Sequence, residues 1–143
     1  MVNISAKTEY ACIAIVDLAA EHASGEPVRL KSIAERHGIP SRFLVQIMLQ
    51  LKSAGLVNSI RGASGGYQLN RDPASISLGE VMRVIEGGES GPRSNLAESN
   101  ATTTALLRVW NEVHASQNEI LDNVAVSELA AEARATGGDM YYI

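Results

Sequence analysis

At 143 residues and 45% hydrophobic content, the chain is long enough to bury one core and fits a soluble, mainly helical protein. Its longest early apolar run, at residues 11–16, is too short to span a bilayer and no signal peptide is visible, so we expect a cytoplasmic protein. The single cysteine, Cys12, excludes an intrachain disulfide and any multi-cysteine zinc or iron–sulfur site within one chain.

The net charge of −4 is distributed unevenly along the chain. Residues 1–75 hold eight basic and six acidic side chains, whereas residues 76–143 hold four arginines and ten acids. The two halves are therefore expected to face different partners. Because DNA attracts basic side chains, it is expected at the first half.

The first predicted helix covers residues 5–23, and between Tyr10 and Ala20 its only charged residue is Asp17. A helix that is apolar nearly all round is covered on more than one side, so we expect it to pack both against the helices predicted next along the chain and against a C-terminal arm. Cys12 lies in this helix without a neighbouring base or metal-ligand set. We interpret it as a small buried core residue.

Residues 33–69 predict two short helices joined by a tight turn and followed by a hairpin. The first helix turns Ile33 inward and ends at Gly38, after which Pro40 restarts the chain. The second helix begins at Ser41, and its apolar stripe is expected to pack on the core: Phe43, Leu44, Ile47, Met48 and Leu51.

Two extended runs follow at residues 57–60 and 67–69, separated by the stretch RGASGG. They predict a hairpin with a flexible, positively charged tip, and residues 28–30 are expected to add a short strand beside it. Helix, turn, helix and hairpin is the order of a winged helix-turn-helix. In that unit the second helix enters the DNA major groove and the wing touches the backbone or the minor groove.

A further helix is predicted after Ile76, where Ser77 and Glu80 form a capping box. Gly87 and Gly88 are expected to close it, and residues 89–100 to form a loop. These elements give a winged helix-turn-helix DNA-binding domain at residues 1–87, a loop at 88–101, and a dimerisation helix with a C-terminal arm at 102–143.

The long amphipathic helix predicted over residues 102–124 cannot bury its apolar stripe within so small a domain. Its simplest partner is the same helix of a second copy. The expected dimer interface contains Leu106, Val109, Trp110, Val113 and Ile120. A short helix over residues 127–134 follows, and we expect Gly137 and Gly138 to end it.

Four runs of sequence carry a resemblance to a known family: IPSRFL from Ile39, AGLV from Ala54, SIRGASGGYQL from Ser59 and VIEG from Val84. The last two runs, together with the helix around Trp110, are distinctive. In these runs the chain resembles the Rrf-type winged-helix transcription regulators, the group that includes IscR, NsrR and CymR. The resemblance extends over residues 7–129.

This resemblance implies a homodimer that binds palindromic double-stranded DNA. It places Arg61 in the minor groove and Lys7 near a phosphate. The resemblance also implies that three residues of the recognition helix face DNA: Ser41, Arg42 and Gln46. Physical chemistry agrees, because arginine and glutamine can read base edges, and an arginine flanked by Gly62 can enter a narrow minor groove.

Two departures separate this chain from the cluster-bearing members of that group. Those members place three cysteines between the capping-box helix and the tryptophan helix, and this interval has none here, which excludes thiolate ligation of a [2Fe-2S] cluster. Glu89, Glu98 and His114 match no metal-ligand spacing, and we interpret them as solvated residues. Val45 stands where cluster regulators often have a glutamate that tunes operator choice, so the operator sequence is left open.

The expected fold is mainly α: a winged helix-turn-helix with a small β-hairpin wing and a long C-terminal dimerisation helix. The expected function is a dimeric, sequence-specific DNA-binding transcription regulator, a repressor, with no cofactor or metal. No nucleotide-binding loop or catalytic constellation points to an enzyme. The alternative is a protein-interaction module on the same scaffold, whose hydrophobic tail ending at Ile143 docks to a partner such as cysteine synthase. The sequence does not identify an effector.

Overall fold

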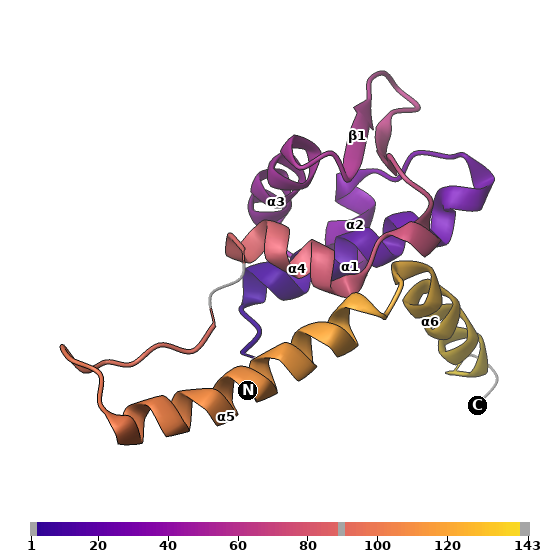
Figure 1. Cartoon of the computed structure of the whole chain (residues 1–143). Helices are drawn as coiled ribbons and strands as arrows, with labels where there is room; N and C mark the ends of the chain where they lie inside the picture. The colour runs from indigo at the N-terminus through magenta and orange to yellow at the C-terminus, as the bar shows by residue number, and fades with distance from the viewer. Residues whose placement is uncertain (1–2, 89–90, 141–143) are drawn as a thin grey trace.

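The computed structural model describes residues 3–88 and 91–140, which contain six α-helices, two single-turn 3-10 helices (His22–Ser24 and Pro73–Ser75) and one hairpin (Figure 1). In chain order the α-helices and strands are α1 (Ala6–Glu21), α2 (Leu30–His37), α3 (Ser41–Ser53), β1 (Val57–Ile60), β2 (Gly66–Leu69), α4 (Leu78–Glu86), α5 (Ala101–Asp122) and α6 (Val126–Met140). This confirms the mainly helical class with a single hairpin. None of the helices in these ranges is both long and apolar enough to cross a membrane. The tail expected to dock to a partner, residues 141–143, lies outside the described residues.

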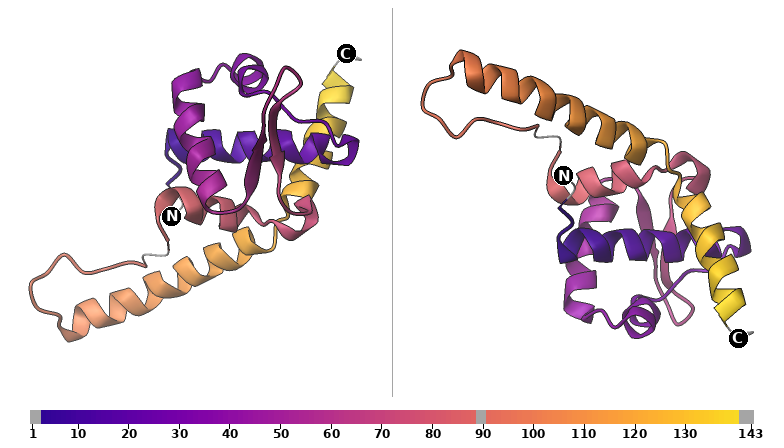
Figure 2. Two further views of the ribbon diagram at one scale, coloured as in Figure 1. Left: turned by 90° about the horizontal axis from the view of Figure 1, so that it is seen from above. Right: turned by 90° about the horizontal axis from the view of Figure 1, so that it is seen from below.

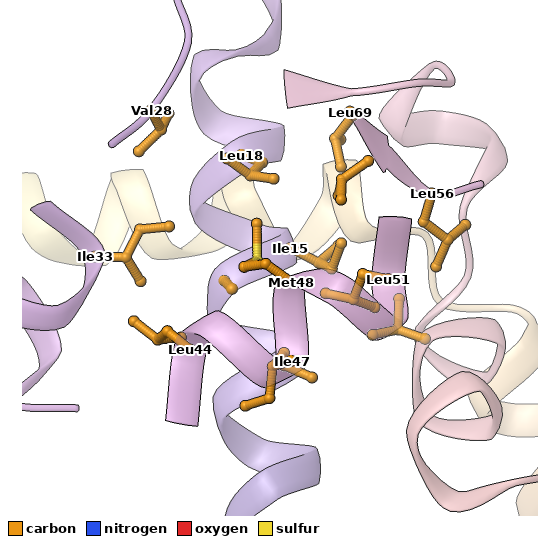
Figure 3. Close-up of a cluster of buried hydrophobic side chains, with 14 of the residues drawn as sticks. Ile15, Leu18, Val28, Ile33, Leu44, Ile47, Met48, Leu51, Leu56 and Leu69 are labelled. Carbon is orange, nitrogen blue, oxygen red and sulfur yellow. The ribbon is translucent and has the colours of Figure 1, made fainter. Parts of the chain in front are cut away.

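The core lies between α1 and α3 and is closed by α2, α4 and the hairpin (Figure 3). α1 supplies Ile15 and Leu18, which are buried because they point from the centre of the helix toward α3. The α3 side of the core consists of Leu44, Ile47, Met48 and Leu51. These four residues recur at the spacing of one helix face, so their burial fixes which face of α3 points outward.

The turn between α2 and α3 has the predicted chemistry. Gly38 adopts a left-handed conformation with φ of 68°, and the chain reverses there without a side-chain clash. Pro40 precedes α3, and Ser41 is the first residue of that helix. At the start of α4 the hydroxyl of Ser77 accepts a hydrogen bond from the Glu80 amide at 3.1 Å.

Asp17, the only charged residue in the middle of α1, joins α1 to the end of α2. Its side chain is 12% exposed, and its carboxylate accepts hydrogen bonds from Arg36 Nη1 at 3.2 Å and from His37 Nε2 at 2.9 Å. A carboxylate this buried is stabilised by such donors. The bonds fix the end of α2 immediately before the turn that leads into α3.

One expectation about α3 and one about α6 are wrong. Phe43 does not belong to the core stripe of α3, because it lies at the edge of that stripe and is 41% exposed, with its ring beside Tyr10 of α1. Gly137 and Gly138 do not end α6, which continues to Met140. α6 packs along α1, and this packing outweighs the roughly 1 kcal/mol helix penalty of each glycine.

α5 leaves the body of the molecule and extends away from it, and the segment that precedes it runs out beside it (Figure 2). Its C-terminal end is joined to the body of the molecule by two hydrogen bonds. There Arg83 Nη2 of α4 donates to Asp122 Oδ1 at 2.7 Å, and the amide of Leu78 donates to the carbonyl of Val124 at 2.8 Å. None of the side chains of α5 is buried within this chain.

Candidate nucleic-acid interface

α3 and the hairpin lie next to each other on one face of the molecule, the face seen from above in the left panel of Figure 2. The view from below shows α1 and α6 on the opposite side. Lys52 of α3 donates a hydrogen bond to the Ser59 hydroxyl of β1 at 2.9 Å, which joins the helix to the wing. The face formed by α3 and the hairpin is the candidate DNA-binding face.

The start of α3 presents the three helix residues that the sequence places on DNA. Ser41, Arg42 and Gln46 are all exposed, because the opposite side of the helix is buried in the core. The Arg42 guanidinium lies over the ring of Phe43, 5.1 Å from its centroid, and that ring is 6.2 Å from the ring of Tyr10. The cation–π contact holds the guanidinium beside the helix before any ligand binds.

The position of Arg61 depends on the geometry of the wing. β1 and β2 pair antiparallel from Val57 opposite Leu69 to Ile60 opposite Gly66. Arg61 follows β1 directly and is exposed at the tip, where the amide of Gly65 donates to the carbonyl of Gly62 at 3.0 Å. Gly62 has φ of 106°, a conformation that favours glycine, and it allows the chain to turn immediately after Arg61.

The segment before α2 supports the base of the wing. Val28 and Tyr67 exchange two backbone hydrogen bonds of 2.9 and 2.8 Å, which is the predicted short strand reduced to a single bridge. Leu30, expected to belong to that strand, begins α2 instead. Gly66 lies next to this bridge, and a Cβ at Gly66 would be 2.5 Å from the Val28 carbonyl oxygen.

Replacing Gly66 with alanine is expected to destabilise the fold by about 2–4 kcal/mol and to weaken DNA binding. The reasons are a φ of 153° and the backbone clash with Val28. Gly137→Ala is the matched control, because Gly137 lies in α6 with open space around it. Alanine at this position is expected to raise the free energy of unfolding by up to about 1 kcal/mol. Chemical denaturation measures both values. Equal changes in the free energy of unfolding for the two substitutions would contradict the requirement for glycine at position 66 beside Val28.

Basic side chains on the candidate face lack carboxylate partners. Among the described residues, none of Lys7, Arg42 and Arg61 has an acid within ion-pair distance. In the described ranges, five other lysine and arginine side chains are ion-paired to acids: Lys31, Arg36, Arg71, Arg83 and Arg108. The positive potential of this face is therefore not neutralised by neighbouring acids and is available to phosphates.

Lys7 lies in the first turn of α1, at the edge of the candidate face. It is exposed and sits one turn before Tyr10, whose ring approaches Phe43 of α3. This position suits a contact with the DNA backbone beside the start of the recognition helix. Two supporting residues were missed by the sequence analysis: Phe43, which holds Arg42, and Lys52, which holds the wing.

The five residues expected at the dimer interface share one face of α5. Leu106, Val109, Trp110 and Val113 are spaced as one helical stripe, and Ile120 continues it two turns later. All five are exposed, with Trp110 at 49%. The structure therefore leaves on α5 an apolar surface that its own chain does not cover.

Cys12 is half-buried on α1 beside the core, in a groove also lined by Leu78 and Met82 of α4 and Leu129 of α6. Burial, followed by the charge of Glu86, raises the pKa of its thiol to about 11. In the part of the chain described, His, Cys, Asp and Glu form no group of three or more that could hold a metal ion. The raised pKa gives the Cys12 thiol the properties of a packed side chain and makes it a poor nucleophile at neutral pH.

Alkylation of Cys12 by iodoacetamide is expected to be about a hundredfold slower at pH 8 than that of an ordinary thiol. A pKa raised from 9.0 to about 11 keeps the thiol protonated, and only the thiolate reacts. The rate is expected to rise about tenfold per pH unit until the pH approaches the raised pKa. Mass spectrometry of native protein, with protein unfolded in guanidinium chloride as control, measures it. Equal rates in the two states would refute the raised pKa.

The model of one protein family, described as Rrf2, iron-dependent transcriptional regulator, matches residues 4–132. The chain is 36% identical over 129 residues to the HTH-type transcriptional regulator CymR of Bacillus subtilis, covering 90% of each protein.

The solved structure of CymR from B. subtilis, titled the global cysteine regulator, superposes with a TM-score of 0.80 at 35% identity, covering 92% of this chain and 98% of that one. The structure of IscR from T. potens superposes with a TM-score of 0.75 at 36% identity, covering 92% and 88%.

Proposed function

This chain belongs to the Rrf2 family of transcriptional regulators, and we propose that it is a homodimeric, sequence-specific repressor that works without an iron–sulfur cluster. The main support for the proposal is that one chain has two separate exposed surfaces. One is the basic face formed by α3 and the wing, and the other is the apolar stripe of α5. The first suits DNA and the second suits another copy of the same helix.

Dimerisation is supported by the geometry of α5. The helix has 22 residues, and none of its side chains is buried by the described part of its own chain. It extends away from the body of the molecule (Figure 1). An apolar stripe centred on Trp110 would be costly to leave in water, and pairing with a second α5 about a two-fold axis removes it from water on both chains. A large aromatic residue at the centre of such a contact is a typical energetic anchor.

A two-fold dimer would present two recognition helices and two wings to one side of a duplex. Half-sites are then expected about one helical turn, roughly 34–36 Å, apart, and the operator is expected to be palindromic. Arg42 and Gln46 would read base edges in each half-site, while Lys7, Ser41 and the wing amides would fix the register on the backbone. Such a protein acts where the chromosome is, in the cytoplasm.

A thiolate-held cluster does not fit the residues of this chain, although the matching family model is described as iron-dependent. The single cysteine, Cys12, lies in α1, and its raised pKa reflects an apolar setting that disfavours a bound thiolate. The segment between α4 and α5 has no cysteine. We propose that the regulatory signal acts through this segment and α5 and alters the spacing of the two recognition helices.

Recovery of genomic DNA fragments by the purified protein tests the proposal. The expected result is enrichment of a palindromic motif upstream of genes. A variant carrying both Arg42→Ala and Gln46→Ala is expected to recover fragments without that motif, because these side chains read the bases. If the wild type enriches no sequence over random fragments, sequence-specific DNA binding is refuted.

A further inference from the structure

Two apolar side chains are exposed on the outer face of the recognition helix. Val45 is 48% exposed and Leu49 is 56% exposed, and they lie one helical turn apart, among the polar side chains of Arg42 and Gln46. Their exposure follows from the burial of Leu44, Ile47, Met48 and Leu51 on the other side of α3.

The two exposed residues point toward different neighbours. Val45 lies two turns before Lys52 on the same side of the helix, and Lys52 bonds to Ser59 of the wing, so Val45 lies on the wing side of α3. Leu49 lines a shallow cavity with Ala54 of the segment after α3 and Val84 of α4. Leu49 therefore has apolar neighbours within its own chain, whereas Val45 lies at the start of the helix, between the two base-reading side chains.

The chemistry of the major groove offers a valine one apolar partner. Each base pair presents hydrogen-bond donors and acceptors there, and only thymine adds a methyl group, at C5. The valine side chain has no polar atom. If it lay against the amino group of cytosine or adenine, that amino group would be a hydrogen-bond donor without an acceptor. Its side chain is also stiff, because branching at Cβ restricts χ1, so little entropy is lost when it is held against a methyl group.

We infer that Val45 is a specificity-determining residue that contacts the C5-methyl group of a thymine in each half-site of the operator. The inference rests on the proposed DNA-binding function and refines it. Arg42 and Gln46 recognise base edges by hydrogen bonds, and Val45, one position before Gln46, adds a requirement for thymine that hydrogen bonding alone does not impose.

In vitro selection from two random duplex pools tests this assignment. One pool is synthesised with thymine and the other with uracil, which keeps every hydrogen-bonding group of thymine but lacks the methyl group. The wild-type protein is expected to select a T·A pair at one position of each half-site from the thymine pool, and to lose that preference in the uracil pool while keeping the rest of the motif.

Affinity measurements on a selected duplex make the test quantitative. Removing the methyl group from one half-site is expected to weaken wild-type binding about fourfold, and from both half-sites about fifteenfold. Val45→Ala is expected to bind the thymine and uracil duplexes equally. Leu49→Ala, the matched apolar truncation on the same helix, is expected to keep the wild-type difference. Circular dichroism verifies that both variants are folded.

The results of the selection and of the affinity measurements distinguish a failure of sequence-specific DNA binding from a failure of the thymine contact alone. If neither pool yields a motif, sequence-specific binding itself is refuted. If both pools yield the same motif with the same strength at every position, DNA binding stands and the thymine contact is refuted. A uracil effect that persists in Val45→Ala, or that disappears in Leu49→Ala alone, also overturns the assignment to Val45.

Discussion

Replacing Arg61 with alanine is expected to lower operator affinity about tenfold to a hundredfold and to leave the fold unchanged. Arg61 is exposed at the wing tip without an acid partner among the described residues, so its removal breaks no internal contact. A guanidinium in the narrow minor groove meets a strong negative potential, and the substitution removes that contact in both half-sites of a dimer. Fluorescence anisotropy with a labelled duplex carrying the recovered motif measures the change.

The matched control is Arg93→Ala. Arg93 is exposed and lies in the segment between α4 and α5, away from the candidate face, so the substitution removes the same charge at another place. Its affinity is expected to remain within about twofold of wild type, because exposed charges beyond a Debye length are screened. Equal losses for the two variants would show a general charge effect and contradict a specific role for the wing.

Replacing Trp110 with glutamate is expected to convert the dimer into a monomer and to reduce operator affinity by at least about a thousandfold. Trp110 lies at the centre of the exposed stripe of α5, where two copies would bury it, and a charge there would be desolvated without a partner. A monomer engages one half-site and loses the additive affinity of the second. Sedimentation velocity measures the oligomeric state, and anisotropy measures the affinity.

Ala115→Glu places the same charge on the opposite face of α5, and Ala115 is also exposed. This variant is expected to remain a dimer with wild-type affinity. A dimeric Trp110→Glu protein would show that the apolar stripe of α5 is not the dimer interface. Dissociation of both variants would place the interface elsewhere on the helix or all around it.

Helix ends and turns were predictable because their chemistry is local. Gly38 ends α2, and Ser77 caps α4 through a hydrogen bond to the Glu80 amide, as the sequence indicated. The reciprocal half of the capping box is not formed, because the Glu80 carboxylate binds Arg71 at 2.6 Å instead. An arginine nine residues away competes for the same oxygens, and local spacing does not reveal such a competitor.

The errors arise where tertiary packing decides. Phe43 fits the apolar period of α3, yet it lies at the rim beside Tyr10, because the aligned positions of Leu44 and Met48 already fill the interior. The helix through Gly137 continues because α6 is held along α1, where Arg134 Nη2 donates to the Ala20 carbonyl at 2.9 Å. Neither neighbour is close in sequence, so neither effect could be predicted from periodicity.

The candidate face could be predicted only as a set of residue types. Spacing placed Arg42 and Gln46 outside the core stripe, and composition placed Arg61 at a flexible tip. The structure adds that the helix and the wing lie on one face and are joined by Lys52 and Ser59. It also adds the exposed fraction of Val45, because residue spacing leaves Val45 outside the core stripe but does not show how much of its side chain is exposed.

Dimeric, sequence-specific binding is tested by the stoichiometry and selectivity of binding to one recovered palindromic duplex at physiological salt. Two chains are expected per duplex, with an affinity at least about a thousandfold above that for a scrambled duplex of equal length. Equal affinity for the two duplexes, or a saturated complex with one chain, would contradict a dimeric, sequence-specific DNA-binding regulator.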